Sequence, residues 1–547
     1  MINNIDNFDN NNSNYDNDDN DENVYSGGIK QKFLGEGSYG CTFYPGITCL
    51  GKNQTKDIIT KIQEINYVSK NEIKISELIK NKVLKNSHAH NRFIYISKSC
   101  IVNYNILQES SLELDKCKQS LNIKNTNNYD NLFNFNSDVN SSNYYYLFSM
   151  QYIKGTTLYD YFKTKYEEVL KEYVKEDIKH HVKHYAKENA NVVFKNIISI
   201  MIYLLQSVNI LNNNNISHND LHYKNILIKD NKNNKKTNDK EIKMNLTINK
   251  KKHLIKLNYL PYIIDFGISF VFKKIINFNR THDKIIDMRY LKQYCLSYNQ
   301  ERFFERCLEY NFVSFIINNN TPQFYNKLDK SNVNNVLTQN NIKDFINDYR
   351  ISIEKYKFDI LFQSNEIDVY LNSVEKYFKK FLDYEQYPTY HDILIEILPN
   401  LFLKNDLYLL IFNFIEFFIN YNNINYTFIV NIINKLFKKI MIPVPEYSLT
   451  SYQFLKIFNY FIYFISNINI SKDMEDDKLH SHIIYQFNQD FDFLLTKILK
   501  INTNNFYNDG YILKYSQDSR VEASNFFNLN NINSQNVITL KNLKIFS

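Results

Sequence analysis

The residues that decide the fold are His218-Asn219-Asp220-Leu221-His222-Tyr223-Lys224-Asn225, followed directly by the apolar run 226–228. They come after an amphipathic segment at 192–211, whose apolar residues recur at the spacing of one helix face. The pattern H-x-D-x-x-x-x-N supplies a carboxylate that can orient and deprotonate a hydroxyl, and an amide oxygen that can bind Mg²⁺. Asp220 and Asn225 have the spacing for these two roles. A polar helix-to-strand turn is the alternative interpretation.

A second segment, Tyr262-Ile263-Ile264-Asp265-Phe266-Gly267, reads as an apolar strand that ends in D-F-G. Asp265 could hold a metal ion that bridges phosphate groups, and Gly267 frees the backbone to turn after it. A three-residue match is common by chance. Its position after the Asp220 segment, at the end of an apolar strand, makes the combination informative.

A glycine-rich segment lies upstream, Gly35-Glu36-Gly37-Ser38-Tyr39-Gly40, and it uses three of the ten glycines in the chain. Glycines let the backbone approach phosphates and direct N–H groups at them. A dinucleotide fold would need a helix directly after the motif, but residues 41–46 predict a strand and a turn. The motif therefore favours a β-hairpin flap over phosphates. Taken alone, it is equally consistent with a tight hairpin that binds nothing.

The predicted strand at 57–62 carries Lys61 near its end, and this lysine could reach the α- and β-phosphates from beneath the flap. Such a lysine needs a carboxylate to hold it. The predicted helix at 71–84 offers Glu72 as the first choice and Glu77 as the alternate. A surface lysine and a solvated helix charge are the ordinary alternatives for these residues.

In this order the segments resemble the eukaryotic-type protein kinase family, over roughly residues 30–300. The strand-like run 147–155 looks like the kinase hinge. The D-L-H form at Asp220 is similar to haspin-type and other divergent serine/threonine kinases. The flap Gly37-Ser38-Tyr39-Gly40-Cys41 looks like that of kinases from large DNA viruses and AT-rich protists.

The resemblance implies ATP and Mg²⁺ as cofactors, with Asp220 and Lys61 as catalytic residues and Asn225 and Asp265 as metal ligands. Met150 would be the gatekeeper. The residues that the resemblance assigns to nucleotide binding are Gly35, Glu36, Gly37, Ser38, Tyr39, Gly40, Lys61, Glu72 and Met150, together with the backbone of Gln151, Tyr152 and Ile153, which would face adenine.

The sequence also departs from the family. Asn219 stands where the family has arginine, which argues against activation by loop phosphorylation, and His222 stands in place of a lysine. No A-P-E motif is present. Asp287 is our candidate for the aspartate that anchors the helices of the large lobe. These departures leave open the preference between serine or threonine and tyrosine.

The fold predicted from the resemblance is α+β: a two-lobed kinase-like fold with a helical C-terminal extension. We expect a disordered acidic Asn/Asp-rich tail at 1–28 and a small lobe of antiparallel strands plus one helix at 29–150, with an insertion at about 109–143. A mainly helical large lobe would cover 151–400, with a Lys/Asn-rich insertion at about 229–252. Residues 401–547 would form the helical extension.

Composition excludes several classes. Hydrophobic residues make up 44% of the 547 residues and aromatic residues 16%, which excludes collagen-like, disulfide-scaffold and wholly disordered chains. The net charge of +7 comes without an arginine-rich stripe, so we predict no nucleic-acid partner. The most apolar runs, 407–419 and 454–465, are shorter than a membrane span.

The six cysteines contain no C-x-x-C pair, which argues against a zinc site and fits a reducing compartment. No secretory signal is visible at the N-terminus. We therefore expect an intracellular, soluble protein, most simply cytoplasmic.

The predicted function is transfer of the γ-phosphate of MgATP to a protein hydroxyl, with serine or threonine favoured. One alternative is a catalytically silent kinase-like scaffold that binds partners through the C-terminal region. Another is a small-molecule phosphotransferase of the choline or aminoglycoside kinase type. The sequence names neither the protein substrate nor the oligomeric state.

Overall fold

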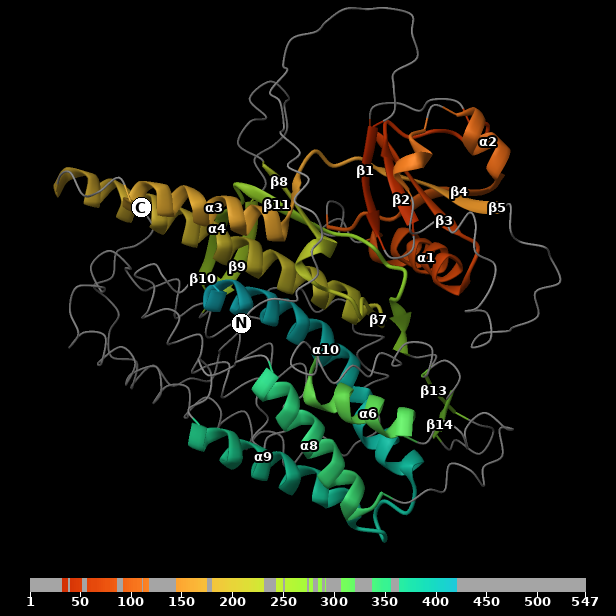
Figure 1. The fold of residues 1–547 in the computed structure, drawn as a ribbon, viewed down its shortest axis with the longest axis vertical. Coiled ribbons are helices and arrows are strands. Elements are labelled where there is room, and N and C mark those ends of the chain that lie inside the picture. Colours follow the sequence, from red (N-terminus) through yellow and green to blue (C-terminus); the bar gives the residue numbers. More distant parts are fainter. Residues whose placement is uncertain are drawn as a thin grey trace, which may run out of the picture.

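Figure 1 shows the fold in a computed structural model. The residues that it describes are 32–37, 40–51, 57–85, 92–110, 112–117, 144–174, 180–230, 243–248, 251–272, 275–278, 284–287, 291, 306–319, 337–355 and 364–420. The predicted tail at 1–28, the flap residues Ser38 and Tyr39, most of the insertion at 109–143 and the extension beyond residue 420 lie outside the described residues.

A five-stranded antiparallel sheet forms one part of the molecule, in the order β1-β2-β3-β5-β4. Its strands are β1 (Lys32–Gly37), β2 (Gly40–Tyr44), β3 (Ile58–Glu64), β4 (Ile96–Asn103) and β5 (Tyr144–Gln151). The predicted glycine-rich hairpin is confirmed, because β1 pairs with β2 and Gly37 lies opposite Gly40. Strand β3 pairs with both β2 and β5, which places Lys61 in the middle of the sheet.

Helix α1 (Tyr67–Leu78) follows β3 and starts at a capping box. The Asn66 side chain accepts from the Ser69 N–H, and the Ser69 hydroxyl accepts from the Asn66 N–H, so two N–H groups at the helix start are satisfied. The helix continues as a single π-helical turn, η1 (Ile79–Val83). Its inner face is apolar at Val68 and Ile75, and the same face carries Glu72 toward the sheet.

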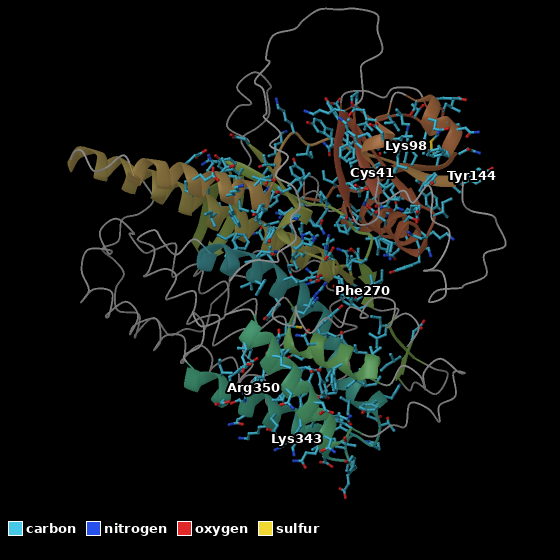
Figure 2. The ribbon with its side chains drawn as sticks, in the orientation of Figure 1. Cys41, Lys98, Tyr144, Phe270, Lys343 and Arg350 are labelled. Atoms are coloured by element: carbon cyan, nitrogen blue, oxygen red, sulfur yellow. A yellow bond between two sulfur atoms is a disulfide. The ribbon has the colours of Figure 1, made fainter. Side chains whose placement is uncertain are left out.

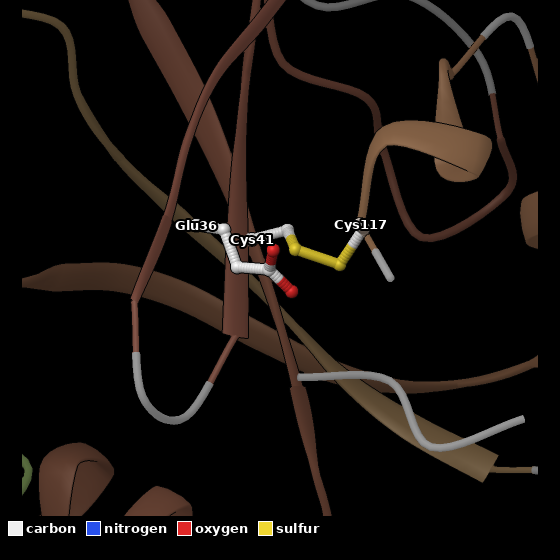
Figure 3. Close-up of side chains that lie close together, drawn as sticks. All are labelled: Glu36, Cys41 and Cys117. Atoms are coloured by element: carbon white, nitrogen blue, oxygen red, sulfur yellow. A yellow bond between two sulfur atoms is a disulfide. The ribbon is translucent and has the colours of Figure 1, made fainter. Parts of the chain in front are cut away.

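Two disulfides cross-link the sheet region, Cys41–Cys117 and Cys49–Cys100. Our expectation of reduced cysteines is therefore wrong for these four residues. The absence of C-x-x-C excluded only local pairs, whereas these bonds join residues separated by 76 and 51 positions. Figure 3 shows the Cys41–Cys117 bond beside Glu36 of β1. It ties β2 to the end of the short helix η2 (Leu114–Lys116), which follows α2 (Tyr104–Glu109).

The second part of the molecule is mainly helical (Figure 1). Its helices are α3 (Leu158–Val174), α4 (His180–Asn213), α6 (Leu308–Asn319), α8 (Gln339–Lys355), α9 (Ser364–Lys379) and α10 (Tyr390–Asn420). Among the described residues, no helix is long and apolar enough to cross a membrane.

The short strands in this part of the molecule form one three-stranded sheet and three two-stranded sheets. Strand β8 (Ile226–Asp230) lies between β6 (Thr156–Thr157) and β11 (Tyr259–Ile263). The remaining pairs are β7 (Ile216–Ser217) with β12 (Phe270–Val271), β9 (Lys243–Ile248) with β10 (Lys251–Lys256), and β13 (Ile276–Phe278) with β14 (Lys284–Ile286). The β9–β10 hairpin begins inside the insertion predicted at 229–252, which therefore contains regular structure.

Backbone hydrogen bonds join the two parts at the start of β4. The N–H of Ile94 donates to the carbonyl of Ile263, and the N–H of Ile263 donates to the carbonyl of Arg92. One apolar core continues across this junction from α1 to α10. Phe270, which is fully buried and labelled in Figure 2, follows the D-F-G segment into this core. The end of β11 is thereby held next to α1.

Helix α10 runs across residue 400, where we expected the helical lobe to end. Its residues from Leu407 to Phe414 are all buried, and they pack with α4 and α6 in the same core. The described residues thus form a mixed α/β structure with a five-stranded antiparallel sheet and a set of helices. This agrees in outline with the predicted α+β class.

Candidate active site

Lys61 lies at the centre of a charged cluster drawn from three elements. Its Nζ atom is 3.0 and 3.1 Å from the carboxylate oxygens of Glu72 on α1, and 3.2 Å from Oδ1 of Asp265 after β11. The side chains of Lys61 and Glu72 are only 12% and 3% exposed. The structure therefore brings together the lysine and the two carboxylates that the sequence singled out, with Glu72 and not Glu77 as the partner.

Burial by itself would lower the pKa of Lys61. The charges of Asp265 and Glu72 outweigh this effect and raise the pKa of the lysine well above its ordinary value. For the carboxyl group of Asp265, burial has the opposite effect and would raise the pKa. The adjacent Lys61 outweighs burial and holds the pKa of Asp265 below its ordinary value. Gln63 also donates to Glu72 through Nε2 at 3.1 Å. At neutral pH Lys61 and Asp265 are therefore charged, whereas burial raises the pKa of Glu72 despite the adjacent lysine.

The D-F-G segment is held against α1 by Asn71, the residue before Glu72. The Nδ2 atom of Asn71 donates to the carbonyls of Gly267 and Ser269, at 2.9 and 2.6 Å. A β-carbon on Gly267 would come within 2.7 Å of the Val68 side chain, so glycine allows the close approach. Asp265 itself has φ of 61°, a left-handed conformation that costs a non-glycine residue of order 1 kcal/mol.

Asp220 and Asn225 lie together in the loop after β7. The Nδ2 atom of Asn225 donates to the carbonyl of Asp220 at 2.9 Å and to its Oδ2 at 3.1 Å. These bonds use the donors of the amide, which leaves Oδ1 of Asn225 as the atom that can ligate a cation. The N–H of Ile264 donates to the carbonyl of Asn225, so the loop is tied to the strand that carries Asp265.

His218 connects the same loop to the D-F-G segment. Its Nε2 atom is 2.9 Å from the carbonyl of Ile264, and the N–H of Asp220 points at its Nδ1. Both contacts are satisfied if Nε2 carries the proton and donates it. The imidazole ring also packs edge-on against Phe266, with ring centroids 5.0 Å apart. The lysine cluster and the Asp220 loop are therefore parts of one connected site.

Asp406 anchors the loop from α10, and sequence reasoning missed it. Its fully buried carboxylate accepts from the N–H of His218 at 2.7 Å and from the N–H of Asn219 at 2.8 Å. Asn413, two helical turns further on, donates to the carbonyl of Leu221. Asp287, our candidate for this anchor, bonds Ile275 and Leu291 through its backbone, and the loop contacts that the structure describes come from Asp406. An aspartate inside the apolar run of α10 was the available signal.

Arg306, just before α6, is the second residue that the motifs did not reveal. Its guanidinium donates to the backbone carbonyl of Asn219, lies 3.3 Å from the Oδ1 atom of the same residue, and packs over the ring of Tyr310. One guanidinium nitrogen is 4.0 Å from Oδ1 of Asp220. The loop thus has a cation beside it, although Asn219 replaces the arginine expected within it.

His222, which replaces the expected lysine, lies 3.6 Å from Asp220 through its Nε2 atom. Burial lowers the pKa of His222 despite the attraction of Asp220. At neutral pH this side chain is therefore mainly uncharged, and it does not replace the charge of a lysine.

The three glycines of the flap are used differently. A β-carbon on Gly40 would lie 2.1 Å from the carbonyl oxygen of Ile62 on the neighbouring strand, so the sheet itself requires glycine there. A β-carbon on Gly35 would meet no atom within 4 Å, and one on Gly37 would meet only the Gly40 carbonyl at 3.8 Å. Packing within the protein therefore does not account for glycine at Gly35 and Gly37.

The segment predicted to face adenine begins at the end of β5, which includes Met150 and Gln151. Met150 and Ile153 are buried, and Gln151 is exposed. The N–H of Tyr152 donates to the carbonyl of Asp57 at 2.8 Å, which extends the pairing of β5 with β3. Of the three backbone positions named from the sequence, Tyr152 therefore turns its N–H to the sheet and not to a ligand.

A different group of potential metal ligands lies at the flap. Glu36, Cys41 and Cys117 place an oxygen and two sulfur atoms within 4.8 Å of one another (Figure 3). The sulfurs are joined to each other as a disulfide. Because a metal binds the thiolate form of cysteine, this group cannot hold one in the oxidised state.

No protein-family model matches the chain, and no curated protein matches it. Among solved structures 53 chains match. One of them is the crystal structure of the BubR1 kinase domain, at 13% sequence identity and a TM-score of 0.23, with 48% of this chain and 58% of that chain covered. The match spans less than two thirds of that chain. A likeness this weak carries no functional conclusion. The function proposed below rests on the geometry of the site itself.

Proposed function

We propose that the chain is a phosphotransferase of the protein kinase type, which transfers the γ-phosphate of MgATP to a hydroxyl group of a protein, with serine or threonine favoured. In this proposal the sheet region with α1 corresponds to the small lobe, and the helices with the Asp220 loop correspond to the large lobe. The observation that carries it is the connection between two charged groups. Lys61, Glu72 and Asp265 form one, and Asp220 with Asn225 forms the other.

The residues present fit a nucleotide with its metal ion. Asp265 and Asn225 offer carboxylate and amide oxygens, which are ligands that Mg²⁺ prefers. Lys61 is a fixed cation beneath the β1–β2 hairpin, and Gly35 and Gly37 leave open space along that hairpin. Bound MgATP would supply the phosphoryl group and neutralise the charge that develops during its transfer.

The side chains of the chain itself would then orient the reactants. Asp220 is about one-third exposed, so its carboxylate is accessible to an acceptor hydroxyl and can take the proton that the hydroxyl loses. The amide of Asn225 donates to Oδ2 of Asp220 through Nδ2, which leaves its Oδ1 as the atom that could bind the metal ion. Lys61, with its pKa raised by the two carboxylates, stays protonated and holds its charge where the phosphates would lie.

The test is transfer of labelled γ-phosphate from MgATP to a generic basic protein and to the chain itself. We expect label with the wild type and a loss of about 10²- to 10⁴-fold in Asp220→Asn, because the base is removed while its shape is kept. Asp368→Asn, an exposed aspartate on α9, is the matched control and should transfer as the wild type does.

The alternatives give different results in the same experiment. Transfer to a small alcohol and not to protein would favour the small-molecule phosphotransferase. MgATP binding by a folded wild type that transfers nothing to either acceptor would favour the kinase-like scaffold. Equal transfer by the wild type and Asp220→Asn would show that Asp220 is not the base.

A further inference from the structure

Glu36, Cys41 and Cys117 come together at the glycine-rich hairpin from three different elements. Glu36 of β1 and Cys41 of β2 are paired positions on neighbouring antiparallel strands, so their side chains lie on the same face of the sheet. Cys117 directly follows η2 and is joined to Cys41 by the disulfide. One carboxylate oxygen and two sulfurs therefore lie within 4.8 Å of one another (Figure 3). In the part of the chain that the structure describes, no other three metal-ligating side chains gather so closely.

The disulfide does not account for the carboxylate beside it. A disulfide has no N–H or O–H group and no positive charge, so it offers Glu36 neither a hydrogen bond nor an ion pair. Cys41 and Cys117 are fully buried, whereas Glu36 is exposed at the edge of the group. One carboxylate oxygen and two thiolate sulfurs around a common point are the ligands of a divalent cation such as Zn²⁺.

The spacing of the three atoms suits a tetrahedral zinc ion. Zn–S bonds of about 2.3 Å and Zn–O bonds of about 2.1 Å place neighbouring ligand atoms about 3.5–3.8 Å apart. The three atoms already lie within 4.8 Å of one another. The Cα atoms of Cys41 and Cys117 are 6.0 Å apart, a separation that two sulfurs bonded to one ion can span. Because Glu36 is exposed, the fourth position is accessible to water.

We propose that Glu36, Cys41 and Cys117 form a zinc site in the reduced protein, and that the Cys41–Cys117 disulfide is the oxidised, metal-free form of this site. A dithiol reductant opens the bond: the dithiol gives up two electrons and two protons and becomes a disulfide, and the two cysteines become thiols. Zn²⁺ then displaces both thiol protons and bonds the two thiolates and the carboxylate. The reverse exchange, with a disulfide as the oxidant, rejoins the two sulfurs and releases the ion.

The two forms hold the hairpin differently. The disulfide joins β2 to the end of η2. The zinc ion holds these two elements and also β1, because Glu36 lies on that strand between Gly35 and Gly37. The metal-bound form therefore fixes both strands of the hairpin. This site does not depend on phosphate transfer, so it is tested separately from the proposed function.

The first measurement uses the full chain and Zn²⁺ alone, with a chromophoric zinc indicator as the competitor. Wild type reduced with a phosphine under anaerobic conditions should bind one more Zn²⁺ than the oxidised wild type, with a Kd of about 1 μM or lower. Glu36→Gln keeps both cysteines and changes an exposed residue. It should bind the additional ion at least about tenfold more weakly. Equal zinc binding by the reduced and oxidised wild type, or wild-type affinity in Glu36→Gln, would overturn the proposal.

The second measurement compares the two disulfides. Cys49→Ser combined with Cys100→Ser is the matched control, because it removes the other disulfide of the sheet region, beside which the described residues place no such group of ligands. This variant should keep the additional zinc ion. Cys41→Ser combined with Cys117→Ser should lose it, together with the near-ultraviolet charge-transfer absorption that Co²⁺ gains from thiolate ligands. The opposite result in the two variants would assign the zinc to the other pair and overturn the proposal.

Circular dichroism of the reduced protein covers the case in which the fold needs the disulfide. A reduced wild type that unfolds and then refolds when Zn²⁺ is added would support the proposal, because metal binding would be coupled to folding. A reduced wild type that stays unfolded with excess Zn²⁺ would overturn it. If the double variant of Cys41 and Cys117 does not fold, the zinc affinity of Glu36→Gln decides the outcome.

Discussion

The lysine cluster and the Asp220 loop are two halves of one site, but they are held in place by different forces. Lys61, Glu72 and Asp265 fix one another directly through ion pairs, in which Lys61 and Glu72 are largely buried and Asp265 is one-third exposed. Asp220 is one-third exposed, and its position depends on backbone bonds from the loop to Asp406 and Arg306.

This difference predicts different responses to mutation. In the lysine cluster the functional atoms are also structural, so the loss of one charge leaves another charge buried without compensation. In the loop the functional carboxylate can be changed at little structural cost, while the residues that anchor the loop cannot. The predictions below test each side of this comparison, beginning with the largest expected effect.

The largest loss of stability is expected for Lys61→Met. It leaves Glu72 buried beside Asp265 without a counter-charge, and breaking such a pair from one side costs about 3–5 kcal/mol. Phosphate transfer should be lost as well. Urea unfolding measures the stability change, with Lys165→Met as the control, because Lys165 is partly exposed and its partner Glu168 is exposed, a pair worth at most about 1 kcal/mol. Equal effects of the two variants would show that the buried cluster is not structural.

The stability difference between the wild type and Lys61→Met depends on pH in a direction that follows from the pKa shifts. The pKa of Asp265 is lowered, so its contribution to stability is present above its ordinary value of 3.8 and is lost as the pH falls through the lower folded value. The pKa of Lys61 is raised, so its contribution is present below 10.5 and is lost as the pH rises through the higher folded value. Burial raises the pKa of Glu72 despite the adjacent Lys61. Without Lys61 the two carboxylates can relieve their repulsion by taking up protons, so the stability difference between the wild type and Lys61→Met should shrink as the pH falls into the acid range and as it rises above 10.5.

Asp406→Ala removes an anchor of the Asp220 loop and should have the next largest effect on stability. Two N–H groups of the buried loop lose their acceptor, at about 1–3 kcal/mol for each group left unsatisfied. Burial raises the pKa of Asp406, so part of this loss is offset by removing a carboxyl that is costly to ionise. We expect a net loss of about 2 kcal/mol in urea unfolding, together with reduced transfer at unchanged MgATP affinity.

Asp368→Ala serves as the control here, since that carboxylate is exposed. A variant of Asp406 with wild-type stability and wild-type transfer would contradict the view that α10 holds the loop. Weaker MgATP binding without loss of transfer would instead assign Asp406 to the nucleotide side of the site.

The sequence located the parts of the site that are encoded in short segments. Asp220 and Asn225 are five residues apart, and Lys61 and Glu72 lie on a strand and the helix that follows it, so spacing and element order were enough to pair them. Asp406 and Arg306 act on Asn219 from 187 and 87 residues away. An aspartate inside the apolar run of α10 marks Asp406 as unusual, but no local pattern shows which loop it or Arg306 bonds, because only the packing of α10 and α6 against the loop brings them together.

The same limit explains why the sequence did not reveal the disulfides or the direction of the Tyr152 N–H. The disulfides join strands and loops that are distant in sequence, so spacing along the chain carries no sign of them. That the segment at the end of β5 faces adenine stays a prediction, and the direction of each N–H in it depends on where pairing with β3 ends. That position is set by Asp57, outside the segment itself.

The smallest effect on stability is expected for Gly35→Ala in the glycine-rich hairpin, where a comparison with Gly40→Ala distinguishes an effect on folding from an effect on binding. Gly40→Ala should cost about 1–3 kcal/mol in urea unfolding, because its β-carbon would overlap the Ile62 carbonyl of β3. Gly35→Ala should change stability by less than about 0.5 kcal/mol, since its β-carbon meets nothing in the protein. It should nevertheless weaken MgATP binding in calorimetry by about tenfold, if phosphates lie along the hairpin as proposed. Unchanged binding by Gly35→Ala would mean that the open space at the hairpin is not where the phosphates lie, and would leave Lys61 as the phosphate contact of the sheet region.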